Sequence, residues 1–200
     1  MEVIEKKSQD QATGYKSIYY PPGGILLWII IFLELITFGL GLMAIVYYGR
    51  LEPELFQLSR QQLNAGIGMV NTLFLLTSGY MMAMAVHRFR EGQFQKSGKY
   101  IQWTLVGGGL FVVLKSYEYF EKLSSGIEVD GNMFFTLYWL LTGFHLIHVL
   151  VGMVILGWMM FKMKAVYADI TLTDLEAGGA FWHMCDLIWL LLFPALYLIF

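Results

Sequence analysis

Several ionisable side chains of this 200-residue chain lie inside long apolar stretches, where a chemical or structural role is needed to explain them. Glu34 lies within the run Ile-Phe-Leu-Glu-Leu-Ile-Thr, far from the ends of its apolar stretch. If that stretch crosses a bilayer, a charge at its centre costs from about 2.5 kcal/mol upward unless it is paired or hydrated. Glu34 is therefore a candidate proton-linked or lipid-contacting carboxylate. The alternative is a protonated acid that hydrogen-bonds a neighbouring helix.

Three charged residues recur at intervals of three positions: Lys115, Glu118 and Glu121. On a helix this spacing places them roughly on one face, and it allows Lys115 to pair with Glu118. A charge-compensated stripe near a membrane surface explains the pattern better than a catalytic role does.

Two further apolar stretches contain histidines. His145 and His148 are three positions apart, as are His183 and Asp186, and Glu176 lies two helical turns before His183. Helical spacing predicts a polar seam inside a bundle, and we use this name for the following set: Glu118, Glu121, His145, His148, Glu176, His183 and Asp186.

The polar seam offers several metal-ligating side chains, but its pattern differs from that of known metal bundles. Di-iron carboxylate bundles use Glu-x-x-His on two helices together with further glutamates. This chain offers Glu-x-x-Glu, His-x-x-His and His-x-x-Asp instead. We therefore expect interhelical hydrogen bonds and contact with a lipid headgroup, no metal ligands and no catalytic residues. A metal-dependent membrane enzyme is the alternative from a different functional class.

The elements that position these residues are expected to be five transmembrane helices. Hydrophobic residues make up 58% of the chain and charged residues 14%, which is outside the range of soluble domains. Apolar stretches of about 20 residues, enough to cross roughly 30 Å of hydrocarbon, recur five times. The expected spans are approximately 24–48, 61–86, 100–120, 134–161 and 173–200, with an aqueous loop containing Pro53 after the first. The fold class predicted is all-α, an integral membrane bundle in one domain over residues 23–200.

Positive charges indicate the orientation, because short cytoplasmic loops are enriched in Lys and Arg. Nine of the thirteen Lys and Arg residues fall in the amino-terminal segment and the second and fourth loops. We expect residues 1–22 to be a polar cytoplasmic segment and the carboxy terminus to be periplasmic. The net charge of -2, without a basic patch, excludes nucleic acid as a partner. The single cysteine, Cys185, is expected to pack in the core. Five aromatic residues near the span ends are expected to anchor them at the interface: Trp28, Tyr47, Tyr48, Trp103 and Trp182.

Four motifs resemble those of the cytochrome c oxidase subunit III family, and they follow one another along the chain in the family's order. The stretch 142–152, TGFHLIHVLVG, resembles the family's TGFHGxHVxxG signature, and 175–200 is similar to its FEAxxWYWHFVDxVW terminus. VNTLFLLTSGY at 70–80 resembles LNTxxLLxSG, and LKSYEYFE at 114–121 is similar to QxxEYxE. The Phe-Leu-Glu-Leu run resembles a family helix with a buried, carbodiimide-reactive carboxylate, which implies that role for Glu34.

The resemblance implies a non-catalytic accessory subunit of a respiratory haem-copper oxidase, either a cytochrome c or a quinol oxidase. It implies that this chain has no haem or copper, which belong to the catalytic subunit I beside it. It further implies bound phospholipid, support of proton uptake and stability of the catalytic subunit. The family's seven-helix members have two spans that are missing here, so the chain resembles shorter bacterial inner-membrane forms. Among those is the companion subunit of nitric oxide reductase, which is the alternative partner.

Overall fold

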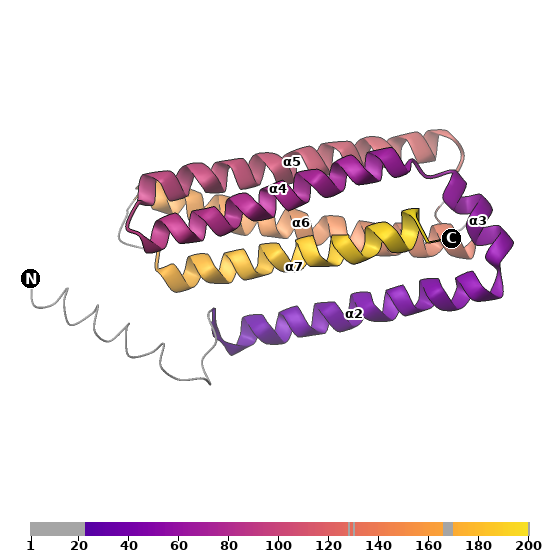
Figure 1. Ribbon diagram of the computed structural model, residues 1–200, viewed down its shortest axis with the longest axis horizontal. Coiled ribbons are helices and arrows are strands. Elements are labelled where there is room, and N and C mark those ends of the chain that lie inside the picture. Colours follow the sequence, from indigo (N-terminus) through magenta and orange to yellow (C-terminus); the bar gives the residue numbers. More distant parts are fainter. Residues whose placement is uncertain (1–22, 128, 130, 166–169, 200) are drawn as a thin grey trace, which may run out of the picture.

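The computed structural model describes residues 23–127, 129, 131–165 and 170–199, with the backbone alone at 164 and 165. The expected amino-terminal segment lies outside this range. All regular elements in the described part are helices, and most lie side by side along one axis (Figure 1). Their bounds are α2 Gly24–Leu51, α3 Pro53–Gln61, α4 Ala65–Arg90, α5 Phe94–Ser124, α6 Met133–Ala165 and α7 Leu172–Tyr197.

The long helices alternate in direction along the chain, and α4, α5, α6 and α7 form the main bundle (Figure 1). Helix α2 packs on one side of this bundle, against α6 and α7. Four helices in the described part, α2, α4, α6 and α7, are long and apolar enough to cross a membrane. The prediction of an all-helical membrane bundle is confirmed. The expected span at 100–120 lies within α5, which is not among these four.

The prediction of an aqueous loop after the first span is wrong, because residues 53–61 form the helix α3. Pro53 occupies its first turn, where the fixed φ angle of proline favours a helix and its missing N–H is not needed. Phe56 and Ser59 are buried and Glu54 is exposed, while Arg60 is partly buried and donates to the Tyr197 carbonyl at 3.4 Å. Residues 53–61 therefore form an amphipathic helix instead of a loop.

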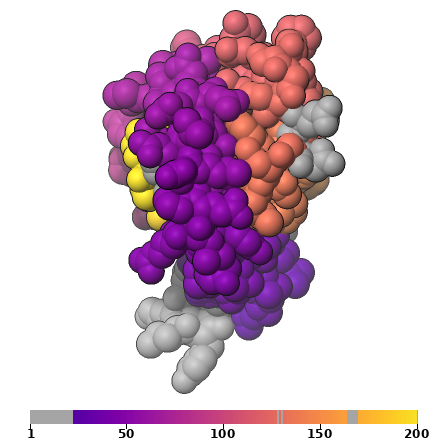
Figure 2. All heavy atoms as spheres, turned by 90° about the vertical axis from the view of Figure 1, so that its right-hand side faces the viewer, coloured from indigo at the N-terminus to yellow at the C-terminus, as the bar shows by residue number. Residues whose placement is uncertain are grey.

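Helix α3 lies across one end of the bundle and is tied to it by polar contacts. Figure 2 looks onto this end, where the purple α3 lies between the yellow end of α7 and the orange α6. The side-chain amide of Asn132 donates to the Ser59 hydroxyl at 3.0 Å, and Lys122 donates to the Gln62 carbonyl. These contacts close the end of the bundle at which α2, α5 and α7 finish.

Two long helices begin at recognisable capping residues. The Asn64 side chain accepts hydrogen bonds from the backbone N–H groups of Gly66 and Ile67 at the start of α4. At the start of α7, Thr171 and Asp174 form a reciprocal capping box. Each cap satisfies N–H groups that have no partner within the helix, and so fixes where the helix begins.

Trp182 lies at the centre of the bundle, so the prediction that it anchors a span at the membrane interface is wrong. Its side chain is fully buried on α7 and its indole N–H donates to the Ser78 hydroxyl of α4 at 3.1 Å. A Cβ atom placed on Gly108 of α5 would lie 2.6 Å from the indole ring, and one on Gly152 of α6 would lie 2.9 Å from it. The two glycines therefore make the space that Trp182 fills. Cys185 is also fully buried, as expected.

Candidate functional site

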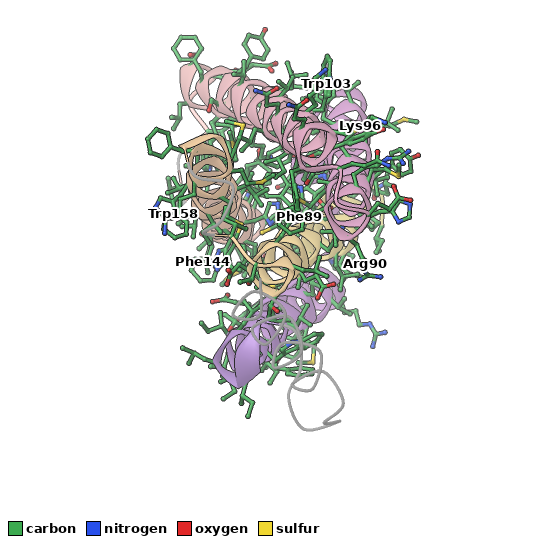
Figure 3. The ribbon with its side chains drawn as sticks, turned by 90° about the vertical axis from the view of Figure 1, so that its left-hand side faces the viewer. Phe89, Arg90, Lys96, Trp103, Phe144 and Trp158 are labelled. Atoms are coloured by element: carbon green, nitrogen blue, oxygen red, sulfur yellow. The ribbon has the colours of Figure 1, made fainter. Side chains whose placement is uncertain are left out.

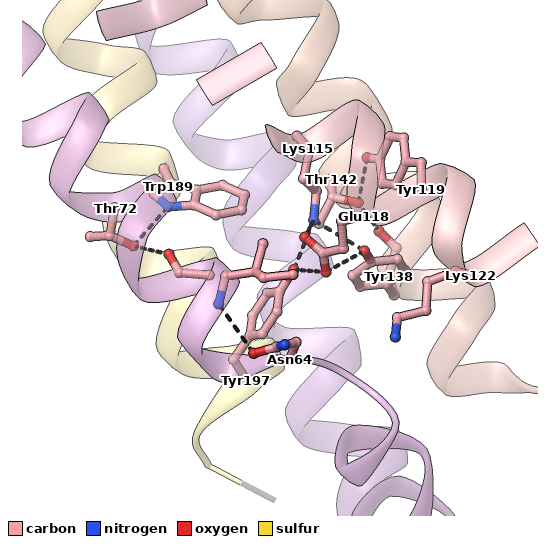
Figure 4. A network of polar contacts seen from close by, with 12 residues as sticks. Asn64, Thr72, Lys115, Glu118, Tyr119, Lys122, Tyr138, Thr142, Trp189 and Tyr197 are labelled. Atoms are coloured by element: carbon pink, nitrogen blue, oxygen red, sulfur yellow. Dashed lines mark hydrogen bonds and ion pairs between the residues drawn. The ribbon is translucent and has the colours of Figure 1, made fainter. Parts of the chain in front are cut away.

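The largest polar cluster is a buried ion pair between Lys115 and Glu118 on α5, held by tyrosines of α6 and α7 (Figure 4). Both charged side chains are fully buried and their charged atoms are 3.1 Å apart. The Lys115 ammonium also donates to the hydroxyls of Tyr138 at 3.1 Å and Tyr197 at 2.8 Å. Both tyrosine hydroxyls donate to Glu118 Oε1, at 2.9 and 2.6 Å. The predicted pairing of Lys115 with Glu118 is confirmed.

Every donor of the Lys115 ammonium is used within this cluster, because its three hydrogens have three acceptors. The ammonium also lies 4.7 Å from the ring centre of Tyr138 and 5.3 Å from that of Trp189, within the range of a cation–π interaction. A buried ion pair is stable only when its remaining hydrogen-bonding capacity is satisfied. This cluster meets that requirement, and it links α5, α6 and α7.

Two further hydrogen bonds extend the cluster outward (Figure 4). The Tyr119 hydroxyl donates to the Thr142 hydroxyl at 2.8 Å, and the Trp189 indole N–H donates to the Thr72 hydroxyl at 3.0 Å. These bonds join α5 to α6 and α7 to α4. The cluster therefore connects all four helices of the main bundle near the end closed by α3.

The second site pairs Glu34 of α2 with His148 of α6. Glu34 Oε2 lies 3.2 Å from His148 Nε2, and the two side chains are 21% and 12% exposed. The imidazole is surrounded by rings of Phe38, Phe144 and Phe181, whose centres lie 5.8, 4.6 and 6.5 Å from its own. The carboxyl group of the first span therefore lies beside an imidazole of a neighbouring helix, in an aromatic enclosure.

A hydrogen bond to the backbone orients the His148 ring. Its Nδ1 lies 2.8 Å from the Phe144 carbonyl oxygen, which can only accept, so Nδ1 donates to it. Nε2 then faces the Glu34 carboxyl group at the distance of an ion pair, although Glu34 Oε2 has no hydrogen bond among the described residues. Two ionisable groups therefore meet between α2 and α6.

His145 lies between these two sites on the inward side of α6. It is fully buried, and neither ring nitrogen has a hydrogen-bond partner among the described residues. Its ring stacks on Trp189 at 5.4 Å and meets the edge of Phe111 at 5.7 Å. His145 therefore packs as an aromatic ring.

The remaining polar residues on α7 form two separate contacts with α4. Glu176 makes an ion pair with Arg90 at 2.7 Å, at the end where α7 begins. His183 Nδ1 lies 3.4 Å from Asp186 Oδ2, about two turns further along α7. Asp186 is pressed against Gly79 of α4, since a Cβ atom there would lie 2.2 Å from its carboxylate oxygen.

The structure therefore distributes the predicted polar seam over several places in the bundle. Glu118 belongs to the lysine cluster, His148 pairs with Glu34, His183 pairs with Asp186, and Glu176 joins Arg90. Glu121 is partly exposed on α5. Within the described residues, no group of three or more His, Cys, Asp or Glu side chains is placed to hold a metal ion.

Two adjoining surface hollows of about 310 and 570 Å³ lie between α5 and α6, at the end where α5 begins. Both are lined by Lys99, Gln102 and Met160, and the larger also by Trp103 and Val106. Trp103 projects from α5 beside the larger hollow, whereas Trp158 lies on the outer side of α6 (Figure 3). The hollow is thus cationic at the helix end and apolar further along α5.

Comparison with known proteins finds a family model described as cytochrome c oxidase subunit III, which matches residues 23–199. A cytochrome c oxidase subunit 3 from Heterololigo bleekeri is 32% identical over 133 residues, 66% of this chain and 50% of that protein. One from Corynebacterium diphtheriae is 25% identical over 138 residues, covering 68% of this chain and 67% of that protein.

A further relative from Aeropyrum pernix is named haem-copper oxidase subunit I+III. It is 24% identical over 181 residues, which are 86% of this chain and 22% of that protein. The chain spans half or less of the length of several of its curated relatives. The match of the family model nonetheless covers all six described helices, and both polar sites lie within it.

Proposed function

The chain belongs to the cytochrome c oxidase subunit III family, and on that premise we propose that it is a non-catalytic accessory subunit of a respiratory haem-copper oxidase. In this role it supports proton uptake by the catalytic subunit and prolongs its active life. The observation that carries the proposal is that the family match extends over the whole helical bundle. The closed lysine cluster agrees with a role in holding helices together.

The proposal includes a fifth transmembrane span, formed by α5. Its 31 residues extend about 46 Å, more than enough to cross the hydrocarbon layer. Its charged Lys115 and Glu118 are buried, while a regular stripe of its exposed side chains is apolar. This stripe consists of Trp103, Val106, Leu110, Val113, Tyr117 and Phe120. Polar residues inside and apolar residues outside are what a helix in lipid requires, and mean hydropathy does not register this arrangement.

For localisation we propose the bacterial inner membrane, with the amino terminus cytoplasmic and the carboxy terminus periplasmic. Support comes from the end of the bundle that bears Arg88, Arg90, Lys96, Lys99 and Lys162, since cytoplasmic ends are rich in Lys and Arg. Alkaline phosphatase fused to the carboxy terminus should be active in this orientation. If that fusion is inactive, and a reporter that works only in the cytoplasm is active at the same position, the orientation is the opposite one.

Glu34 and His148 are the proposed proton-linked pair. We expect Glu34→Gln to leave the complex assembled but to shorten its active life and lower proton uptake during turnover. The amide has nearly the shape of the acid and keeps its place beside His148, but it cannot release a proton. The measurements are oxygen consumption over time and proton uptake from a weakly buffered solution. Glu121→Gln is the control, and an unchanged lifetime and uptake in Glu34→Gln would show that the pair only packs the helices.

Bound phospholipid is proposed for the hollow between α5 and α6. An anionic headgroup would meet Lys99 and Gln102, with an acyl chain along the apolar continuation of the hollow. We expect Lys99→Gln to lower the amount of anionic phospholipid that remains with the purified chain. Quantitative lipid mass spectrometry measures it, with the exposed Lys96→Gln as the matched control. Equal lipid content in all three proteins would remove this proposal.

The partner is tested by purifying the tagged chain from its native membranes in mild detergent. A haem-containing subunit that co-purifies and consumes oxygen supports the proposal. A partner that consumes nitric oxide instead supports the reductase companion. A haem spectrum or stoichiometric iron, copper or zinc in the isolated chain would contradict the accessory role and support a metal-dependent enzyme.

A further inference from the structure

One face of the bundle exposes an ionisable pair near the middle of a membrane-spanning helix. The His183 side chain is 46% exposed, and it lies about 16 Å from the start of α7 and about 21 Å from its end. At this depth an imidazole faces hydrocarbon chains, which offer it no hydrogen bond. Exposed polar groups are rare in such positions because leaving them unpaired is costly.

Asp186 holds the exposed imidazole in place beside α4. Its Oδ2 contacts His183, whereas its Oδ1 is buried with no hydrogen-bond partner among the described residues. Gly79 makes room for the carboxylate against α4, because any side chain there would occupy its position. The bundle therefore holds a carboxylate in place while leaving one of its oxygens unsatisfied.

The opposite side of the bundle has a different surface at comparable depth. The outward face of α6 consists of apolar side chains there, among them Ile147, Leu150 and Val154. Figure 3 shows the two sides, with Trp158 of α6 on the left and Arg90 of α4 on the right. Lipid alone is a suitable neighbour for the α6 side but leaves the α7 side with unmet hydrogen bonds.

We propose that the face formed by α4 and α7 around His183 and Asp186 is the surface on which a transmembrane helix of the catalytic partner subunit docks. That helix presents a hydrogen-bonding side chain to the exposed His183 imidazole, which Asp186 orients. Apolar residues flank the pair on both helices and would exclude lipid at the contact: Leu76 and Tyr80 on α4, Leu187 and Leu190 on α7. The inference rests on the proposed function and specifies where its partner binds.

Photo-crosslinking in the native membrane tests the face directly. Benzoylphenylalanine is placed at Leu187, which is 46% exposed on α7, or at Val154, which is 71% exposed on α6. After irradiation, the tagged full-length chain is purified and its adducts are identified by mass spectrometry. We expect the position 187 probe to form adducts with the haem-containing subunit in at least about ten-fold higher yield than the position 154 probe.

A second variant tests the hydrogen bond itself. His183→Leu should lower the haem-containing subunit retained per chain about five-fold, as expected for one interhelical hydrogen bond in a membrane. His183→Gln should restore part of the loss, and Trp158→Leu on α6 should cause none. Circular dichroism of each purified chain checks that its helical content is unchanged.

The outcomes separate this inference from the proposed function. Adducts formed at 154 and not at 187, adducts with a second copy of the chain, or adducts with lipid alone would overturn the docking face. The proposed function would survive those results as long as the unaltered chain retains its haem-containing partner. If the unaltered chain retains none, the proposed function itself fails.

Discussion

Replacing Lys115 with methionine is expected to lower the free energy of unfolding by about 3–5 kcal/mol, the usual cost of removing one partner from a buried ion pair. Lys115 is fully buried and donates to three acceptors. Methionine fills similar space but leaves Glu118 without a cation, and two tyrosine hydroxyls without a donor. Unfolding in mixed micelles of increasing denaturing-detergent content, followed by circular dichroism, measures the loss.

The double variant Lys115→Met, Glu118→Gln shows whether charge compensation is the cause. The glutamine is neutral and still accepts from Tyr138 and Tyr197, so the double variant should be more stable than Lys115→Met alone. Lys96→Met is the control, because Lys96 is exposed on the same helix. A double variant as unstable as the sum of its single changes would show that the two charges are not coupled.

Trp182→Ala is expected to have a comparable effect, a loss of about 3–5 kcal/mol, because it opens a large cavity where α4, α5, α6 and α7 meet. The indole fills the space between Gly108 and Gly152 and donates to Ser78. The same titration in mixed micelles measures the loss.

Trp103→Ala is the matched control for this cavity. Trp103 is 62% exposed, so its removal should change the free energy of unfolding by no more than about 0.5 kcal/mol. Gly108→Leu should also destabilise the bundle, because the larger side chain would overlap the Trp182 ring. Equal stability of Trp182→Ala and Trp103→Ala would contradict the central position of Trp182.

The sequence predicts the helical pattern and the contacts within one helix well. Apolar stretches of sufficient length identify the five long helices, though not the short α3, and three-residue spacing predicts the ion pair between Lys115 and Glu118. The order of the motifs also predicts the family. These features depend on local periodicity, which a single sequence displays directly.

Contacts between distant helices could not be predicted in this way. Periodicity says that Glu34 and His148 lie on helices, but it does not say that these helices touch. It likewise gives no sign that Tyr197 reaches Lys115 across the bundle. Trp182 was misplaced because tryptophan is common at membrane interfaces, and only the packing around Gly108 and Gly152 shows its burial.

The central claim is that this chain supports a catalytic partner without performing the chemistry itself. The most direct test removes the chain from the native complex and follows gas consumption until activity stops, with and without the restored full-length chain. The account predicts that the depleted complex still turns over but inactivates several-fold sooner, and that the restored chain returns the original lifetime. An inactive depleted complex that retains its haem, or one with an unchanged lifetime, would contradict it.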